Sequence, residues 1–338
     1  MIVGEVAVEA PHSSAASPVG ADPRLSHFPV SFFATVMGLA GLSLAWLRAE
    51  PVLVPSWVVG EMLFWVALAA GAAVLATYAA KVVRHPGAVL AEARHPVRLA
   101  FLPTSGIALV LLAAAGQDIA PALAEMLWWS GAAAQLVLTL FVLSSWVSRP
   151  SFVSGQVTPA WFIPVVGLVA VPLAGVRFAP LGISWFFFAA GTLFWLALLP
   201  LVLGRLFVHE QPVPAKLLPT LAVLVAPPAV IMLAYVRLVP DAFSTPAPQA
   251  MYDVAVFFAL LLATQVRTLA RLPFFLSWWA YSFPLAALSV ATTVMAAEYG
   301  GALEGAAWVL LAGVTLLVVL LTARTAVEIV RRRICVPE

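Results

Sequence analysis

Residues 278–284 read Trp278-Trp279-Ala280-Tyr281-Ser282-Phe283-Pro284, which places aromatic side chains and a proline inside an otherwise apolar segment. A proline within a helix leaves the carbonyl group one turn earlier without its donor and bends the helix axis. If the segment crosses a bilayer, such a break survives only beside other protein or next to a water-filled cavity. The stretch therefore predicts a membrane-spanning helix that is surrounded by protein and has Phe283 at its break.

The composition of the whole chain indicates an integral membrane protein. Of its 338 residues, 63% are hydrophobic and only 9% are charged, and the mean hydropathy is +1.05. A soluble domain carries roughly a quarter of charged residues. We therefore expect most of the chain to lie within a lipid bilayer.

Hydrophobic runs long enough to cross the membrane occur ten times. About 20 apolar residues span the hydrocarbon core. The runs have approximate bounds 28–47, 57–82, 97–116, 119–147, 159–176, 180–204, 217–237, 249–270, 274–297 and 304–327. Several connections are very short, so neighbouring spans must pair as antiparallel hairpins. We predict an all-α fold of ten transmembrane helices arranged as five hairpins.

The lysines and arginines indicate how the spans are oriented. With ten spans, fourteen of the 17 basic residues fall on one side of the membrane, and the other side holds only Arg48, Arg177 and Arg237. Cytoplasmic connections are enriched in lysine and arginine. We therefore expect a multi-pass protein of the cell's inner (cytoplasmic) membrane with both termini in the cytoplasm.

Prolines distinguish the odd-numbered spans from the even-numbered ones. Pro200, near the end of the sixth span, is the main exception among the even spans, whereas the odd spans hold Pro103, Pro164, Pro172, Pro227, Pro228 and Pro284. A helix that lines a wet cavity can hydrate the carbonyl groups that proline frees, whereas a lipid-facing helix cannot. We predict odd spans inside and even spans outside, in a quasi-fivefold arrangement around a central pore. The alternative is that proline and glycine are simply common in membrane helices.

The two ends of the chain differ from the ten-helix domain, which we place at residues 27–330. Residues 1–26 are rich in proline and serine and lack a basic start followed by an apolar core, so we expect a disordered tail and no signal peptide. Residues 331–338 form a short basic tail that we place in the cytoplasm. Cys335, the single cysteine, excludes a disulfide framework.

The stretch around Phe283 resembles the tellurite-resistance/dicarboxylate transporter family, which includes the plant slow anion channels and bacterial TehA-like channels. Four further stretches resemble this family in the same order: His27-Phe28-Pro29 with Gly38-Leu39, His95-Pro96-Val97-Arg98, Pro164-Val165-Val166-Gly167 and Val225-Ala226-Pro227-Pro228. The resemblance covers roughly residues 27–330. It implies a homotrimer in which each subunit has its own anion pore.

By the same resemblance, the ring of Phe283 plugs the pore, with Trp279, Tyr281 and Pro284 supporting it. Hydrophobic constrictions can close a pore by excluding water. The competing interpretation is that Phe283 is one packing residue among 20 phenylalanines. Weaker candidates for lining the pore are Phe32, Phe33, Pro103, Phe162, Pro164, Gly167, Pro227 and Pro228.

We expect passive movement of small anions such as chloride or nitrate. The alternatives are a proton-coupled transporter of a C4-dicarboxylate such as malate or of an oxyanion such as tellurite or sulfite, and a sensor or assembly subunit that only shares the fold. Coupled transporters carry protonatable groups inside the membrane. Glu61, Glu125 and Asp253 instead fall near the starts of even spans, where a carboxylate favours the helix dipole.

The sequence offers little support for other classes of function. It has no nucleophile elbow, metalloprotease motif or phosphate-binding glycine loop, so we expect neither an enzyme nor a cofactor. Its five histidines are too scattered for a metal site. The basic residues are dispersed through the connections, which argues against nucleic-acid binding. The expected partners are small inorganic anions or carboxylates, the lipid bilayer and two further copies of the chain.

Overall fold

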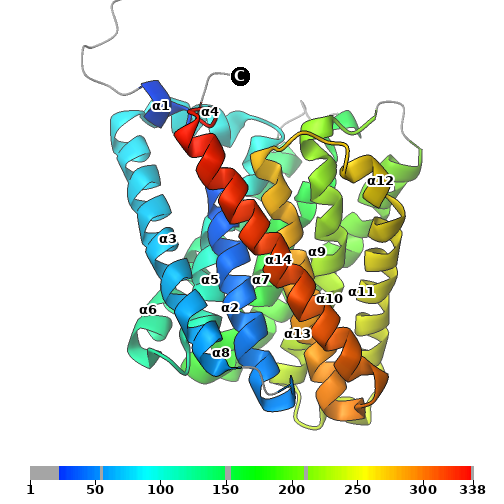
Figure 1. Ribbon diagram of the computed structural model, residues 1–338. Helices are drawn as coiled ribbons and strands as arrows, with labels where there is room; N and C mark the ends of the chain where they lie inside the picture. Colours follow the sequence, from blue (N-terminus) through cyan, green and yellow to red (C-terminus); the bar gives the residue numbers. More distant parts are fainter. Residues whose placement is uncertain (1–22, 54–55, 149–153, 209–211, 336–338) are drawn as a thin grey trace, which may run out of the picture.

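Helices make up the regular structure of the protein throughout the described residues (Figure 1). The computed structural model describes residues 23–53, 56–148, 154–208 and 212–335. Residues 1–22 of the expected N-terminal tail, and 336–338 of the C-terminal one, lie outside this range. The described end of the N-terminal segment forms the short helix α1 (Pro23–Ser26).

Ten helical segments are long and apolar enough to cross a membrane, as predicted. In chain order their elements are Val30–Phe32 (η1) with Phe33–Leu53 (α2), Trp57–Arg84 (α3), Arg98–Phe101 (η2) with Thr104–Gly116 (α5), Pro121–Ser148 (α6), Pro159–Trp161 (η4) with Phe162–Ala170 (α7) and Pro172–Phe178 (α8), Leu181–Phe207 (α9), Ala215–Val225 (η5) with Ala226–Leu238 (α10), Ala247–Thr264 (α11), Leu276–Tyr281 (η7) with Ser282–Tyr299 (α13), and Ala302–Val330 (α14). The shorter helices are α4 (Pro86–Arg94), η3 (Ser154–Gln156), η6 (Ala242–Ser244) and α12 (Val266–Leu269).

Some of the observed helices end at other residues than the hydropathy of the sequence predicted. The first span was expected to end at residue 47, but α2 continues through Pro51 to Leu53. Its last turns carry Arg48 and Glu50, so the apolar run ends before the helix does. Conversely, the eighth span was expected to reach residue 270, but α11 ends at Thr264 and a separate short helix, α12, follows it.

Each odd span packs against the even span that follows it, which confirms the five hairpins. The contacts pair α2 with α3, α5 with α6, α7 and α8 with α9, α10 with α11, and α13 with α14. The odd spans also contact one another in the order α2, α5, α7, α10 and α13, and α13 returns to α2. The five odd spans therefore form a closed ring. That the ring has quasi-fivefold symmetry stays a prediction.

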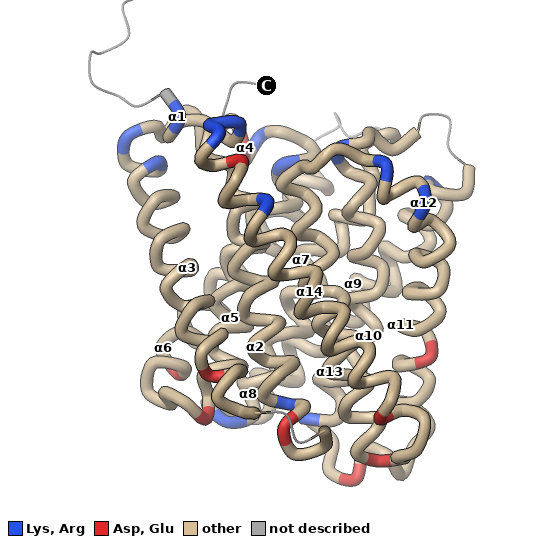
Figure 2. The backbone as a smooth tube through the Cα atoms, in the orientation of Figure 1, with Lys and Arg blue, Asp and Glu red and all other residues tan. Residues whose placement is uncertain are grey.

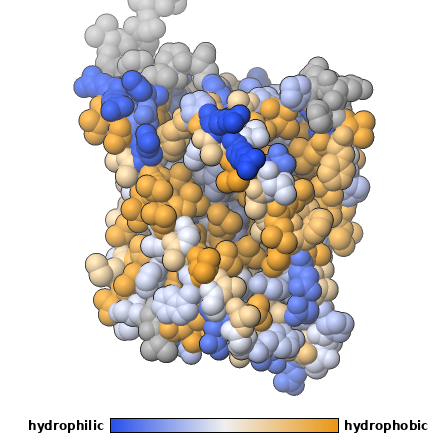
Figure 3. All heavy atoms as spheres, turned by 45° about the vertical axis from the view of Figure 1, so that its right-hand side comes forward, coloured by the Kyte–Doolittle hydropathy of each residue, from blue (hydrophilic) through white to orange (hydrophobic). Residues whose placement is uncertain are grey.

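Burial separates the ring from its surroundings. In the odd spans 78–94% of the most apolar stretch is buried, whereas in the even spans the share is 22–33%. The even helices expose large apolar side chains such as Trp65, Phe186, Leu193 and Leu320. In Figure 3 apolar residues cover the middle of the visible face, and hydrophilic ones gather toward its two ends. Odd spans are thus inside and even spans form the lipid-facing layer, as predicted.

Charges are sorted between the two ends of the bundle (Figure 2). Lysines and arginines gather at the end that holds α1, α4 and α12, which we call the basic end. Most described carboxylates lie at the opposite end, which we call the acidic end, and only Arg48, Arg177 and Arg237 join them there. Both described ends of the chain lie at the basic end. Arg149, which the sequence assigned to this side, lies outside the described residues.

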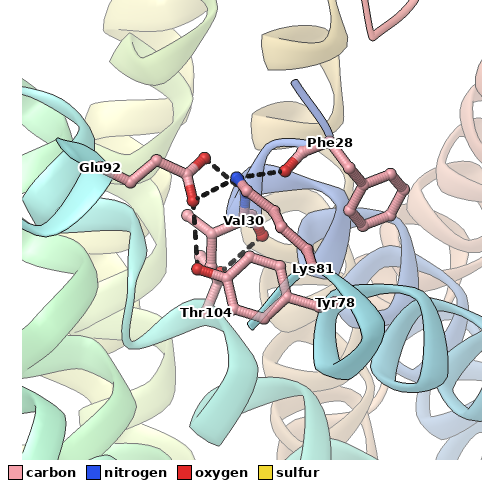
Figure 4. A network of polar contacts seen from close by, with 6 residues as sticks. All are labelled: Phe28, Val30, Tyr78, Lys81, Glu92 and Thr104. Carbon is pink, nitrogen blue, oxygen red and sulfur yellow. Dashed lines mark hydrogen bonds and ion pairs between the residues drawn. The ribbon is translucent and has the colours of Figure 1, made fainter. Parts of the chain in front are cut away.

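A buried ion pair fastens the start of the first span (Figure 4). Nζ of Lys81 on α3 lies 2.8 Å from Oε2 of Glu92 on α4, and the two residues are 1% and 4% exposed. Lys81 also donates to the carbonyl oxygen of Phe28 at 2.8 Å. Oε1 of Glu92 accepts the N–H of Val30 at 3.3 Å, and Oε2 accepts the hydroxyl of Tyr78 at 3.1 Å. Because each charge has several partners, the network can hold Phe28 and Val30 in place without water.

The charge sorting predicts which end faces the cytoplasm. In a Cys335→Ser background, Ser244→Cys at the acidic end should react with a membrane-impermeant thiol reagent added to intact cells. Gly87→Cys at the basic end should react only after permeabilisation, since lysine-rich and arginine-rich connections stay inside. Both positions are exposed, and nothing lies within 4 Å of a side chain added at Gly87. The reverse labelling pattern would refute the orientation.

The Lys81–Glu92 pair predicts a large coupling between two substitutions. Lys81→Met leaves Glu92 buried without its cation, and breaking a buried pair in this way costs about 3–5 kcal/mol. Replacing both residues, as Lys81→Met with Glu92→Leu, removes the uncompensated charge and should recover part of that loss. Thermal unfolding of the purified protein in detergent, followed by tryptophan fluorescence, measures the two effects. Equal unfolding temperatures for the single and double variants would contradict the coupling.

Candidate functional site

Each of the five inner spans begins as a 3-10 helix at the basic end and changes into an α-helix. The change is direct from η1 to α2, η4 to α7, η5 to α10 and η7 to α13, and it passes through two residues between η2 and α5. We call these five positions the junctions. Since all odd spans run in the same direction, the junctions belong to the same half of the ring. A 3-10 segment within a span often marks a functional hinge or a strained sequence.

The prolines predicted to break the inner spans lie at or next to helix starts and not in the middle of α-helices, which corrects the simple expectation of kinked helices. Five of them lie at the junctions, and Pro172 begins α8. Pro284 is the third residue of α13, Pro164 the third of α7 and Pro228 the third of α10. Pro103 directly precedes α5. The first N–H groups of an α-helix have no partner inside the helix, so proline loses nothing there. The sequence reveals that breaks are present, but their form depends on the 3-10 turns before them.

Phe283 is the second residue of α13, at the junction of the ninth span, and its ring lies against α2. A side chain added at Gly41 would lie 3.8 Å from Cδ2 of Phe283 and 3.1 Å from Cβ of Ala286. Only 6% of Phe283 is exposed. The aromatic ring therefore packs between α13 and α2, where the absence of a side chain at Gly41 brings α2 close.

Trp279 and Ser282 hold the same junction through hydrogen bonds and a close contact with α2. The indole N–H of Trp279 donates to Oγ1 of Thr325 on α14 at 2.9 Å, and Oγ of Ser282 donates to the carbonyl oxygen of Trp279 at 2.6 Å. A Cβ at Gly38 would lie 2.4 Å from Oγ of Ser282 and 2.8 Å from Cε3 of Trp279. The backbone of α2 therefore approaches the junction at Gly38, where any larger residue would collide.

Tyr281 points away from Phe283. It belongs to a small apolar cluster with Ala222 of η5 and Leu269 of α12, and within the described residues its buried hydroxyl has no hydrogen-bond partner. Trp279, Tyr281 and Phe283 are two residues apart in the sequence, but their side chains contact different helices. Trp279 contacts α14, Tyr281 contacts η5 and Phe283 contacts α2. Trp279 and Tyr281 thus hold the segment on which Phe283 is mounted.

The other aromatic candidates occupy corresponding junctions but pack differently. Phe32 ends η1 and stacks on Phe28, with ring centroids 4.5 Å apart. Phe33 begins α2, and its ring makes an edge contact with the ring of Tyr78 on the outer helix α3, with centroids 5.9 Å apart. Phe162 begins α7 and is fully buried. That these residues line a pore stays a prediction.

Gln135 of α6 contacts the junction of the fifth span, and the sequence analysis did not identify it. Its Nε2 donates to the carbonyl oxygen of Pro164 at 2.8 Å, and Oγ1 of Thr139 donates to the same oxygen at 3.1 Å. A side chain added at Gly167 would lie only 2.1 Å from Nε2 of Gln135. Because Gly167 has no side chain, the amide of Gln135 can reach the junction of the fifth span from the outer helix α6. A lone glutamine in an apolar span was the signal that could have revealed it.

Pro227 and Pro228, the remaining candidates, are both buried in the first turn of α10. The carboxylates that would indicate coupled transport lie elsewhere: Glu61 is on α3, Glu125 on α6 and Asp253 on α11. All three are in outer helices at the acidic end, and none is fully buried. Among the described residues no group of three or more histidines, cysteines or carboxylates could hold a metal ion.

Comparisons with known proteins agree with this architecture. Residues 27–326 match the SLAC1 family model, which is described as a voltage-dependent anion channel. The chain is 27% identical to an uncharacterised transporter of Methanocaldococcus jannaschii, with 82% of this chain and 87% of that protein covered. It is 27% identical to the tellurite resistance protein TehA homolog of Haemophilus influenzae, with 82% and 83% covered.

A plant protein gives a similar match over a smaller share of its length. The S-type anion channel SLAH2 of Arabidopsis thaliana is 28% identical, and the alignment covers 88% of this chain but 58% of that protein. The family match extends over nearly all the described residues and includes all five junctions. The chain therefore belongs to the SLAC1 family of anion channels and transporters.

Proposed function

We propose that the protein is a passive channel for small anions and that the ring of Phe283 closes it. The observation that carries this proposal is the position of Phe283, a buried aromatic side chain at a helix junction of one of the five spans that form the closed ring. Channels can close by excluding water from an apolar constriction. The low exposure of Phe283, 6%, supports a closed pore at this level.

The charges of the inner spans favour anions over cations. All five inner spans lie within the described residues, and their only carboxylates, Glu50 and Glu298, are in the last turns at the acidic end. Rings of aspartate or glutamate select cations, and the middle of this ring offers none. The α-helix N-termini at the junctions carry partial positive charge. They would attract an anion weakly enough to let it pass.

We further propose a homotrimer of the inner (cytoplasmic) membrane, with one pore per subunit and both termini in the cytoplasm. The resemblance to the slow anion channels supports the trimer, and the charge sorting supports the orientation. Proton-coupled transport of a dicarboxylate or an oxyanion is the competing function. It is favoured by the name of the Haemophilus influenzae relative, a tellurite resistance protein.

Truncation of Phe283 should open the pore. Phe283→Ala should raise anion conductance severalfold in planar bilayers with a chloride gradient, and Phe283→Leu should give an intermediate increase because it keeps part of the bulk. A phenylalanine that only packs behaves differently, since its truncation opens a cavity and costs about 3–5 kcal/mol. Poor expression without any gain in current would then be expected.

Phe258 provides a matched control. It is also 6% exposed, but it lies on the outer helix α11. Phe258→Ala should therefore lower stability without raising the current. If Phe283→Ala carries no more current than the parent protein at equal incorporation, Phe283 is not the gate.

Neutralising the outer carboxylates should separate a channel from a proton-coupled transporter. Glu61→Gln, Glu125→Gln and Asp253→Asn should leave chloride and nitrate conductance nearly unchanged, because these side chains lie on outer helices. They are in the second turn of α3, α6 and α11 and not in the first turn that the sequence predicted, so the helix dipole acts on them only weakly. Flux into proteoliposomes, with and without a pH gradient, measures the effect. Loss of flux in one variant that still folds and assembles would favour coupling.

A further inference from the structure

Three arginines depart from the sorting of charge between the two ends. Arg48, Arg177 and Arg237 lie near the ends of inner spans that start at the basic end, so they belong to the acidic end, where Figure 2 shows few lysines or arginines and the positive-inside rule expects few. Each belongs to an inner span: Arg48 to α2, Arg177 to α8 and Arg237 to α10. By contrast, four carboxylates of this end lie on outer helices: Glu61, Glu125, Asp253 and Glu304. The cations of the acidic end are therefore concentrated on the inner ring.

The three arginines converge although α2 is not a neighbour of α8 or α10 in the ring. Nη2 of Arg237 on α10 approaches Oε1 of Gln117, at the end of α5, at 3.5 Å. In the ring, α7 and α8 stand between these two helices. The residue that follows this glutamine, Asp118, pairs with Arg177 and lines a cavity with Arg48, so the three arginines lie around one connection. Gln117 directly follows α5 and Arg237 is the penultimate residue of α10, so their contact lies at the acidic-end mouth of the ring.

Carboxylates balance the cluster only in part. Arg177 forms an ion pair with Asp118, in the α5–α6 connection. Arg48 lines a cavity of about 330 Å³ together with Asp118 and Glu50. Three guanidinium groups thus face two carboxylates. Arg177 and Arg237 are exposed and Arg48 is half-buried, so ions in solution can reach them.

We propose that Arg48, Arg177 and Arg237, with the amide of Gln117, form a recruiting site for small monovalent anions at the acidic-end mouth of the ring. The proposal deepens the proposed channel function and rests on it for its role in conduction. A guanidinium group is weakly hydrated and presents several N–H donors, so it can exchange water for chloride or nitrate at little cost. Fixed charges at a mouth raise the local concentration of ions of opposite sign. Here they offset the repulsion from the surrounding carboxylates.

The proposal predicts opposite effects for opposite charges. Removing one unit charge about 6 Å from an ion in water changes its local concentration by about threefold. In the Phe283→Ala channel at about 20 mM salt, Arg237→Gln should therefore lower the conductance of chloride that enters from the acidic end by about threefold. Asp118→Asn should raise it by a similar factor. Both effects should nearly vanish at about 1 M salt, where the Debye length is only about 3 Å.

Two further variants serve as controls. Arg237→Lys keeps the charge and should stay close to the parent at low salt. Arg324→Gln removes an exposed arginine from the outer helix α14 at the basic end and should leave conductance from the acidic end unchanged. If Asp118→Asn lowers conductance as Arg237→Gln does, or if neither changes it, the recruiting site is refuted.

A binding measurement tests the site without any current. Chloride-35 resonances broaden when chloride exchanges with a protein site, so the purified protein in detergent should broaden the line and Arg237→Gln with Arg48→Gln should broaden it less. Arg324→Gln again provides the control. Equal broadening by all proteins refutes the site. If the site binds chloride but neither the parent nor Phe283→Ala conducts, the proposed channel function fails and the binding site stands.

Discussion

The lipid bilayer offers no hydrogen bonds to a helix backbone, and the rest of this structure depends on that constraint. Uninterrupted α-helices satisfy their own backbone groups, whereas breaks must be covered by protein or reached by water. The five outer spans are continuous α-helices in lipid, although α9 includes Pro200 near its end. The five inner spans all change from 3-10 to α. The outer layer therefore makes the irregular inner ring possible.

The same constraint explains why polar groups lie where they do. Gln135 reaches from an outer helix to the carbonyl oxygen of Pro164, and Thr325 reaches from another to the indole of Trp279. At the basic end the Lys81–Glu92 pair binds both the carbonyl oxygen of Phe28 and the N–H of Val30. Outer helices thus provide partners for groups at the irregular starts of inner spans as well as shielding them from lipid.

Sequence alone could predict the features that depend on composition along the chain. Ten apolar runs, the sorting of lysine and arginine, and the prolines of odd spans follow from local residue types, and the structure has the ten spans and the two layers. It could not predict contacts between distant residues. Nothing in the sequence pairs Gly167 with Gln135, Lys81 with Glu92 or Arg237 with Gln117, because helix rotation and side-chain reach determine these contacts. The 3-10 junctions were missed for a similar reason: proline indicates a break but not its geometry.

The four aromatic residues in the stretch 278–284 differ in how their side chains are held. Three are anchored by a hydrogen bond or by packing in a separate cluster, and Phe283 is left as the residue that can move. The indole of Trp278 donates to the carbonyl oxygen of Pro273, that of Trp279 donates to Thr325, and Tyr281 packs into a cluster of its own. Displacing either indole breaks a hydrogen bond, and a buried donor left without a partner costs about 1–3 kcal/mol.

Phe283 has no polar atom in its side chain, and the position beside it on α2 is a glycine, Gly41. Its ring can therefore leave its position without breaking a hydrogen bond. A residue that must both exclude water and move needs this combination of apolar bulk and weak attachment. Of the four aromatic residues in the stretch, Phe283 alone combines a place at the start of an inner α-helix with a side chain that makes no polar contact.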